Sequence, residues 1–197
     1  MSAKGTRRTA KREIIEVVSE VCLPITVMNC QTATSIIEST LSHILFMREQ
    51  IPDPIQVIRQ ILETESVDDV KLTRQRQKLA KLLKYFDEVQ AAIAYICSNS
   101  SIRDVNFVIG ATVTSPRELY ILHFPEKSNW DFAASISDRA RNECCRRVVR
   151  EMVGKWSEVY SRYAPPVATN AYVAILPHAQ PDSVIPYEGA VTGLPFS

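Results

Sequence analysis

The residues best suited to chemistry in this chain are a thiol and an imidazole, Cys97 and His123. A cysteine becomes a nucleophile when a nearby base or positive charge lowers the pKa of its thiol. Cys97 falls in the last turn of an expected helix, beside Ser98, and no neighbour in the sequence would acidify it. The other histidines, His43 and His178, are far from it along the chain. We therefore expect no Cys–His nucleophile, and structural roles for the three histidines.

Other catalytic patterns are also missing. The acidic pairs Glu63/Glu65 and Asp68/Asp69 share one expected loop, whereas the carboxylates of a glycosidase converge on a cleft from separate elements. Only five glycines occur, so neither GxGxxG nor a Walker phosphate loop can be written. There is no GxSxG elbow and no HExxH metal motif. The sequence predicts a protein that is not an enzyme and uses no cofactor or metal.

The composition is typical of a single folded domain. Of 197 residues, 46% are hydrophobic and 23% are charged, and the net charge is +1. No apolar run approaches the roughly 20 residues of a membrane span. The five cysteines are odd in number and form no CxxC pair, so reduced thiols are expected. We expect a protein of the nucleus and cytoplasm, without a nucleic-acid or membrane partner.

The first half of the chain is predicted to be mainly helical. Residues 1–12 are basic and are expected to form a flexible tail. Because of Pro24, residues 21–27 ("VCLPITV") are expected to form an edge strand or the first strand of a sheet. From Thr34 the apolar residues recur at helical spacing until "IPDP" at 51–54. Further helices are expected at 55–63 and at about 69–97.

The second half is predicted to supply most of the sheet. Residues 105–113 and 117–124 form an expected hairpin, with a corner at Pro116 and a solvated start at Arg117 and Glu118. Gly110 inside the first strand indicates either a bulge or close packing by a helix. The longest helix is expected from about Asp131 to Tyr163, and a strand at 171–177. This order predicts an α+β fold, an antiparallel sheet with three main helices packed on one face.

The long helix carries more apolar surface than a core-facing stripe needs. Its core stripe is Cys145, Val148, Met152, Trp156, Val159 and Tyr163, which fall within about 60° of one line. Val149 and Val153 lie about 40° and 80° to one side, beside Arg146 and Arg150. Acidic residues alternate with the arginines, which fits a mixed surface helix or a protein-binding face better than a nucleic-acid site.

Three stretches together resemble one family. They are "LSHILFMREQIPDP" (41–54), "DEVQAAI…RDVNFVIGATVTSPRELYILHF" (87–124) and "CCRRVVREM" (144–152), which runs on to "APP". Their order and spacing are similar to those of the Comet family, HORMA-like proteins that bind the closed form of the mitotic arrest deficient checkpoint protein. The resemblance implies a single HORMA-like domain over 13–197, with 171–197 as its last strand and a safety-belt-like C-terminal segment.

The resemblance also implies a function and a site. Comet proteins are adaptors that dock on a closed HORMA protein as a pseudo-dimer and present it to a Pch-type AAA+ ATPase, which silences the spindle checkpoint; meiotic HORMA proteins are related clients. The family's docking surface places Met47 and Val149 at the contact, flanked by Arg146, Arg150 and Val153. Here Met47 stands in place of a glutamine, and Val149 in place of a phenylalanine.

A second class of function fits the same element order. A small longin-like trafficking or scaffold module also combines a sheet with helices and binds a GTPase or coat protein. In that reading, the arginine-rich long helix would face an acidic partner. The sequence leaves this alternative open.

Overall fold

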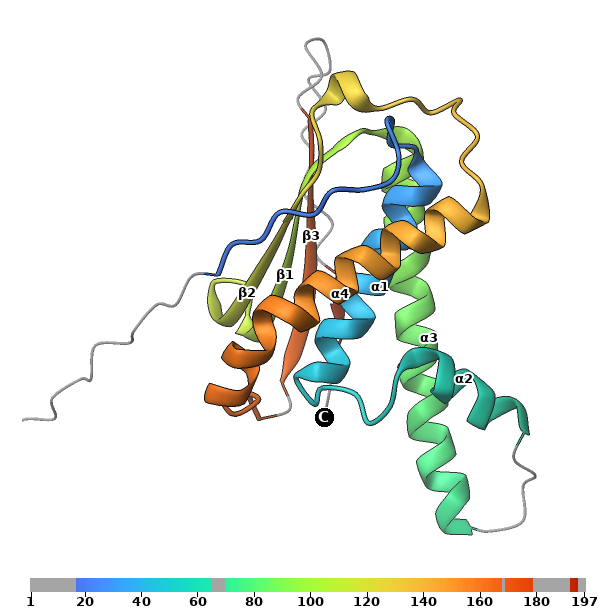
Figure 1. The fold of residues 1–197 in the computed structure, drawn as a ribbon. Coiled ribbons are helices and arrows are strands. Elements are labelled where there is room, and N and C mark those ends of the chain that lie inside the picture. The colour runs from blue at the N-terminus through green and yellow to red at the C-terminus, as the bar shows by residue number, and fades with distance from the viewer. Residues whose placement is uncertain (1–16, 65–69, 168, 179–191, 195–197) are drawn as a thin grey trace, which may run out of the picture.

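The computed structural model describes residues 17–64, 70–167, 169–178 and 192–194, and it has an α+β fold (Figure 1). In chain order the elements are α1 (Cys30–Met47), α2 (Ile55–Thr64), α3 (Val70–Asn99), β1 (Ile102–Thr112), β2 (Ser115–His123), the 3-10 turn η1 (Lys127–Asn129), α4 (Asp138–Arg162), β3 (Asn170–Pro177) and β4 (Thr192–Leu194). The predicted α+β class and antiparallel sheet are confirmed, as are the elements at 55–63 and 171–177.

The sheet is antiparallel, with strand order β2-β1-β3-β4. Val105 in the central strand β1 lies opposite Leu122 of β2 and Ile175 of β3. The predicted bulge is present, because the β1–β2 register shifts on both sides of Gly110. A Cβ atom there would approach the carbonyl oxygen of Ser115 to 2.7 Å, so the hairpin closes only with glycine at this position.

Helix α1 is the centre of the helical layer, which lies on one side of the sheet (Figure 1). Its residues at helical spacing are buried from Ala33 to Leu45, and they pack with the inward side chains of β1 and with α3 and α4. Asn29 caps the helix by accepting a hydrogen bond from the Thr32 amide at 2.9 Å. Because of this cap, α1 begins four residues before the expected start at Thr34.

The prediction of a strand at 21–27 is wrong. Residues 17–28, which we call the N-terminal strap, are extended but join no ladder apart from a single bridge between Met28 and Trp130. The strap lies beside α4 instead, where the Cys22 carbonyl accepts a hydrogen bond from Arg147. Side chains of Val21, Leu23 and Ile25 reach the core from this position. Pro24 has no backbone N–H group, so this position cannot donate a hydrogen bond to a neighbouring strand.

The long helix was predicted to begin at about Asp131, and this boundary is also wrong. The backbone at 129–134 is already engaged: Met28 bonds to Asn129 and Asp131, and the Asn29 side chain donates to Ala134 O at 2.8 Å. Helix α4 therefore begins after Ser137, whose hydroxyl accepts from the Ala140 amide at 3.3 Å. The longest helix is α3, with 30 residues, and not α4, with 25.

Candidate partner-binding surface

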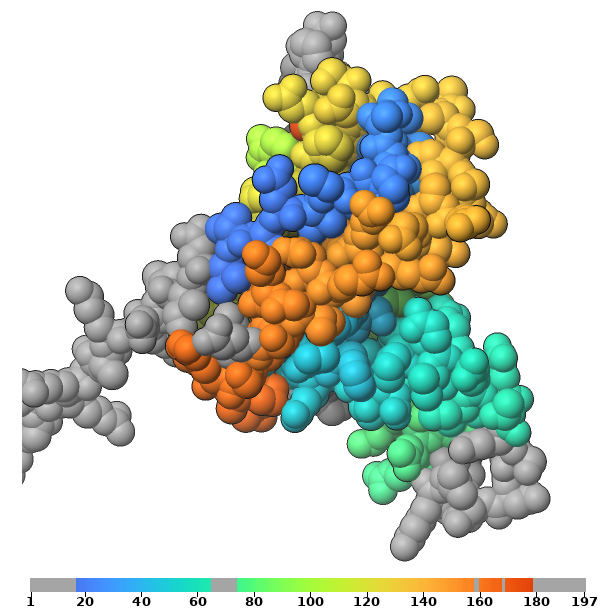
Figure 2. All heavy atoms as spheres, viewed as in Figure 1, coloured from blue at the N-terminus to red at the C-terminus, as the bar shows by residue number. Residues whose placement is uncertain are grey.

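Helix α4 crosses the front of the molecule in Figures 1 and 2 and presents one face to solvent. Cys144, Val148 and Met152 are buried beneath it, as the helical period requires. The predicted contact residues lie on the other sides: Val149 is half-buried, Arg146 and Arg150 are exposed, and Val153 is 46% exposed. A β-branched apolar side chain therefore stands in water between charged neighbours. We call these four residues and Met47 the α4 surface.

The charges around the α4 surface are largely balanced within the helix. Glu143 pairs with Arg147 at 3.2 Å and with Arg146 at 4.0 Å, and Glu151 pairs with Lys155 at 3.9 Å. These are i,i+3 and i,i+4 pairs, which hold the long side chains along the helix. The feature of this surface that these ion pairs leave uncovered is therefore the exposed apolar side chain of Val153.

One flank of α4 is covered by the N-terminal strap. The Ser19 hydroxyl donates to Glu151 at 3.0 Å, and Arg147 donates to Cys22 O at 3.1 Å. Figure 2 shows the blue strap seated along one side of the orange helix, with the cyan end of α1 on the other side. The open part of α4 is thus a strip bounded by the strap and by the end of α1.

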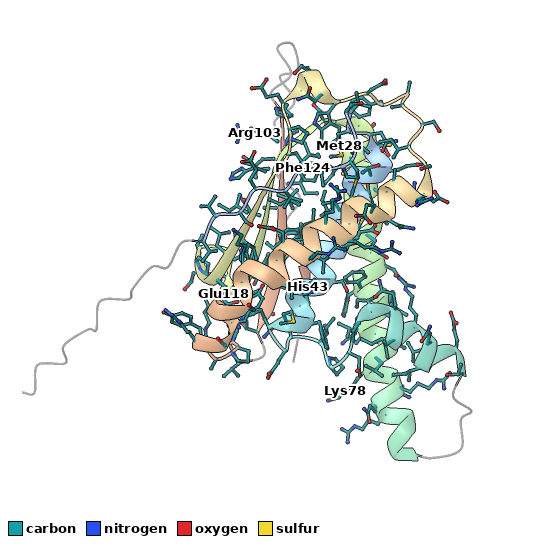
Figure 3. All side chains as sticks on the ribbon, in the orientation of Figure 1. Met28, His43, Lys78, Arg103, Glu118 and Phe124 are labelled. Atoms are coloured by element: carbon teal, nitrogen blue, oxygen red, sulfur yellow. The ribbon has the colours of Figure 1, made fainter. Side chains whose placement is uncertain are left out.

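Met47 is the last residue of α1 and is half-buried. The same end of α1 carries His43, on the part of the helix that passes behind α4 in Figure 3. Burial lowers the pKa of His43, and its Nε2 has no hydrogen-bond partner among the described residues. The side chain is therefore neutral at physiological pH. The end of α1 thus presents mainly apolar and uncharged groups toward α4.

The next residue, Arg48, fixes the position of this helix end. Its side chain is only 2% exposed and forms a bidentate ion pair with Glu118 of β2, in which Nε lies 3.0 and 2.9 Å from the two carboxylate oxygens. It also donates to the carbonyl oxygens of Tyr163 and Ala164, both at 3.2 Å. Three segments, the end of α1, strand β2 and the end of α4, therefore meet at one guanidinium group. We call this group of contacts the Arg48 clamp.

Aromatic rings enclose the Arg48 clamp. The Arg48 guanidinium carbon lies 5.2 Å from the centre of the Tyr160 ring, and Tyr120 donates to Glu118 at 2.8 Å. Burial by itself would lower the pKa of the Arg48 guanidinium. The hydrogen bonds and the charge attraction to Glu118 together have the larger effect, so the pKa is raised. Burial also raises the pKa of Tyr160 to about 12, so both groups keep their protonated form.

The Arg48 clamp was not predicted from the sequence. Glu118 was expected to be a solvated residue at the start of a strand, and Pro116 was expected at a corner. The structure instead places Pro116 inside β2, opposite Gly110, and turns Glu118 inward toward Arg48. The only sequence signal was a lone glutamate on the inward-facing side of a strand, two residues before Tyr120.

The candidates for chemistry are not brought together. Burial raises the pKa of the Cys97 thiol to about 11, although a hydrogen bond with the Thr34 side chain acts in the opposite direction. His123 is exposed, and its Nδ1 lies 2.7 Å from Asp104. In the part of the chain that the structure describes, no group of three His, Cys, Asp or Glu residues could hold a metal ion. None of the helices described there is long and apolar enough to cross a membrane.

Two parts of the predictions lie outside the described residues. They are the basic tail at 1–12 and most of the C-terminal segment after His178, of which the structure describes only β4. Within the described part, all five residues of the α4 surface lie on α4 or at the end of α1, and these two helices pack against one another.

In comparisons with known proteins, no family model matches this chain and no curated protein matches it.

Proposed function

We propose that this protein is a non-enzymatic, HORMA-like adaptor that binds a closed-form HORMA protein through the α4 surface. The bound protein would be of the mitotic arrest deficient type or a meiotic relative. In this proposal the adaptor presents its partner to a Pch-type AAA+ ATPase for remodelling, in the nucleus and cytoplasm. The resemblance of the three sequence stretches to the Comet family supports the proposal, and so does an antiparallel sheet covered by helices on one side.

The observation that carries the proposal is the exposure of Val153 on a helix where Glu143 and Glu151 already pair with neighbouring cations. The exposed part of the Val153 side chain contributes no hydrophobic stabilisation to the folded monomer. Burial against a partner would remove this apolar surface from water, which favours binding. Arg146 and Arg150 flank it and can cover the rim of an interface with their aliphatic stems and charged ends. The surface therefore has an apolar centre and a polar border.

The Arg48 clamp gives this surface a fixed shape. Met47 belongs to α1 and the valines to α4, so a partner that contacts both needs the two helices in one relative position. Arg48 bonds both to β2 and to the carbonyl groups at the end of α4, and Gln50 adds a bond to Pro166 O at 3.0 Å. A preorganised surface binds with less loss of conformational entropy.

The experiment is capture of a purified closed-form HORMA protein by the immobilised full-length chain. Val153→Asp would place an unpaired carboxylate in the interface, and we expect capture to weaken by about 3 kcal/mol, roughly a hundredfold or more. Because Val153 is already exposed, the variant should fold as the native chain does, which circular dichroism checks.

The matched control is Val57→Asp. Val57 is a helical valine on α2 with a similar exposure of 39%, outside the α4 surface. Capture should be unchanged by this variant. If folded Val153→Asp captures the HORMA protein as well as Val57→Asp does, the proposed docking surface is wrong.

A further inference from the structure

The N-terminal half of α3 carries a cluster of positive charge that the α4 surface does not involve. Residues 70–86 contain six lysines and arginines and no aspartate or glutamate. Three of the six, Arg74, Lys78 and Lys81, are exposed and follow i, i+4, i+7 spacing, so they line one side of the helix over about 10 Å. We call these three residues the α3 basic row.

This half of α3 stands apart from the body of the molecule. Among the side chains of α3 that the structure describes, from Arg74 onward, the first buried one is Phe86, and before it Leu79, Leu82 and Leu83 are only partly buried. Figure 1 shows this part of the helix extending beyond the sheet and α1, with α2 packed beside it. In Figure 3, Lys78 projects from α3 on the side opposite α2. The α3 basic row is therefore accessible.

The two carboxylates of α3 that follow the row, Asp87 and Glu88, are engaged elsewhere. Asp87 pairs with Arg59 of α2, and Glu88 lies 3.8 Å from Lys84. Within the described residues, no carboxylate lies within ion-pair distance of any member of the α3 basic row. This differs from α4, where acidic residues of the same helix pair with the arginines. Three adjacent cations that no described carboxylate neutralises repel one another and favour an anionic partner.

We propose that the α3 basic row is a second docking site, which binds an acidic segment of a partner protein. A helix with carboxylates at i, i+4 and i+7 has the same period as the row and can place one carboxylate near each cation. The proposal is independent of the α4 surface. It gives an adaptor a way to hold a second protein while the first occupies α4.

The surroundings of the row favour a protein over a nucleic acid or a membrane. A nucleic acid is a continuous polyanion and would extend past this short row toward Asp87 and Glu88. Single strands also need open aromatic faces, whereas Lys81 lies over the half-buried Tyr85 ring, 5.7 Å from its centre. The exposed residues between the cations include Gln75 and Gln77, which offer no apolar face to a lipid surface.

The test uses the full-length, isotope-labelled chain and a synthetic alanine-rich helical peptide with glutamates at i, i+4 and i+7. Amide shifts of residues 74–84 should change saturably on titration, and the same peptide with glutamines should have no effect. The charge-reversal variant Arg74→Glu, Lys78→Glu, Lys81→Glu should raise the Kd by about tenfold or more. Val153→Asp should bind the peptide as the native chain does.

The matched control carries Arg117→Glu, Lys127→Glu and Arg139→Glu. These cations are exposed, lie outside both surfaces, and change the net charge by the same amount. Equal weakening by both triple variants would overturn the proposal, because binding would then follow net charge alone. So would the absence of saturable shifts up to about 1 mM peptide. Tighter, row-dependent binding of single-stranded DNA or of phosphatidylserine vesicles would assign the row to a different class of partner and overturn it as well.

Discussion

Helix α4 and the N-terminal half of α3 are both rich in lysine and arginine, but they differ in whether acidic residues of the same helix pair with these cations. On α4, Glu143 and Glu151 pair with neighbouring cations, and an apolar side chain, Val153, is left exposed. On α3, the leucines pack inward and the exposed side is a row of cations without counter-charges among the described residues. A count of lysines and arginines would treat the two helices alike, yet one surface exposes an apolar side chain and the other a row of cations, and we propose a different partner for each.

The two regions also differ in how they are anchored. The end of α4 is held by the buried Arg48 clamp, whereas α2 and α3 are joined by an exposed ion pair between Arg59 and Asp87. A buried pair is costly to break because one charge is left without a partner in a low dielectric. An exposed pair is solvated again at little cost. Replacing the arginine of each ion pair by methionine therefore compares how strongly the buried and the exposed pair stabilise the fold.

The largest effect is expected from Arg48→Met. It removes the partner of Glu118 and the donors to Tyr163 O and Ala164 O, so we expect unfolding to become easier by about 3 to 5 kcal/mol. Arg59→Met removes the exposed pair, and its expected cost is about 1 kcal/mol or less. Urea denaturation of both variants measures the difference. Equal costs would show that the Arg48 clamp is not the stronger anchor.

The next effect concerns salt and separates the two surfaces. Capture of a HORMA protein on α4 should change by less than about twofold between 0.1 and 0.5 M NaCl, because the centre of the surface is apolar and both Glu143 and Glu151 pair with cations of the same helix. Binding of the glutamate peptide to the α3 basic row should weaken about tenfold over the same range. Affinity measurements in both buffers give the comparison. Equal salt dependence at the two surfaces would remove the distinction between them.

Local patterns in the sequence predicted much of the fold. Prolines at 52 and 54 set the start of α2, alternating apolar residues gave β3, and Gly110 marked the bulge in β1. These features depend on neighbours in the chain. The exposed flank with Val153 was found in the same way, from the angular positions of side chains on one helix.

Features that depend on distant residues were not predictable in this way. Residues 131–137 look helical, but hydrogen bonds to Met28 and Asn29 hold part of this segment out of the helix. Arg48 and Glu118 are 70 residues apart, and each has the local appearance of a surface residue. The cations of the α3 basic row can be read from the sequence, but the lack of a counter-charge among the described residues depends on where Asp87 and Glu88 direct their side chains.

The central claim is that α4 contacts a closed HORMA protein, and site-specific photo-crosslinking tests it most directly. A benzophenone amino acid placed at Val153 should form a covalent adduct with the purified closed-form protein, and mass spectrometry should map the adduct. The same group at Val57, which is similarly exposed on α2, should form none. Equal crosslinking from both positions, or none from Val153 while the two proteins remain bound, would contradict docking on α4.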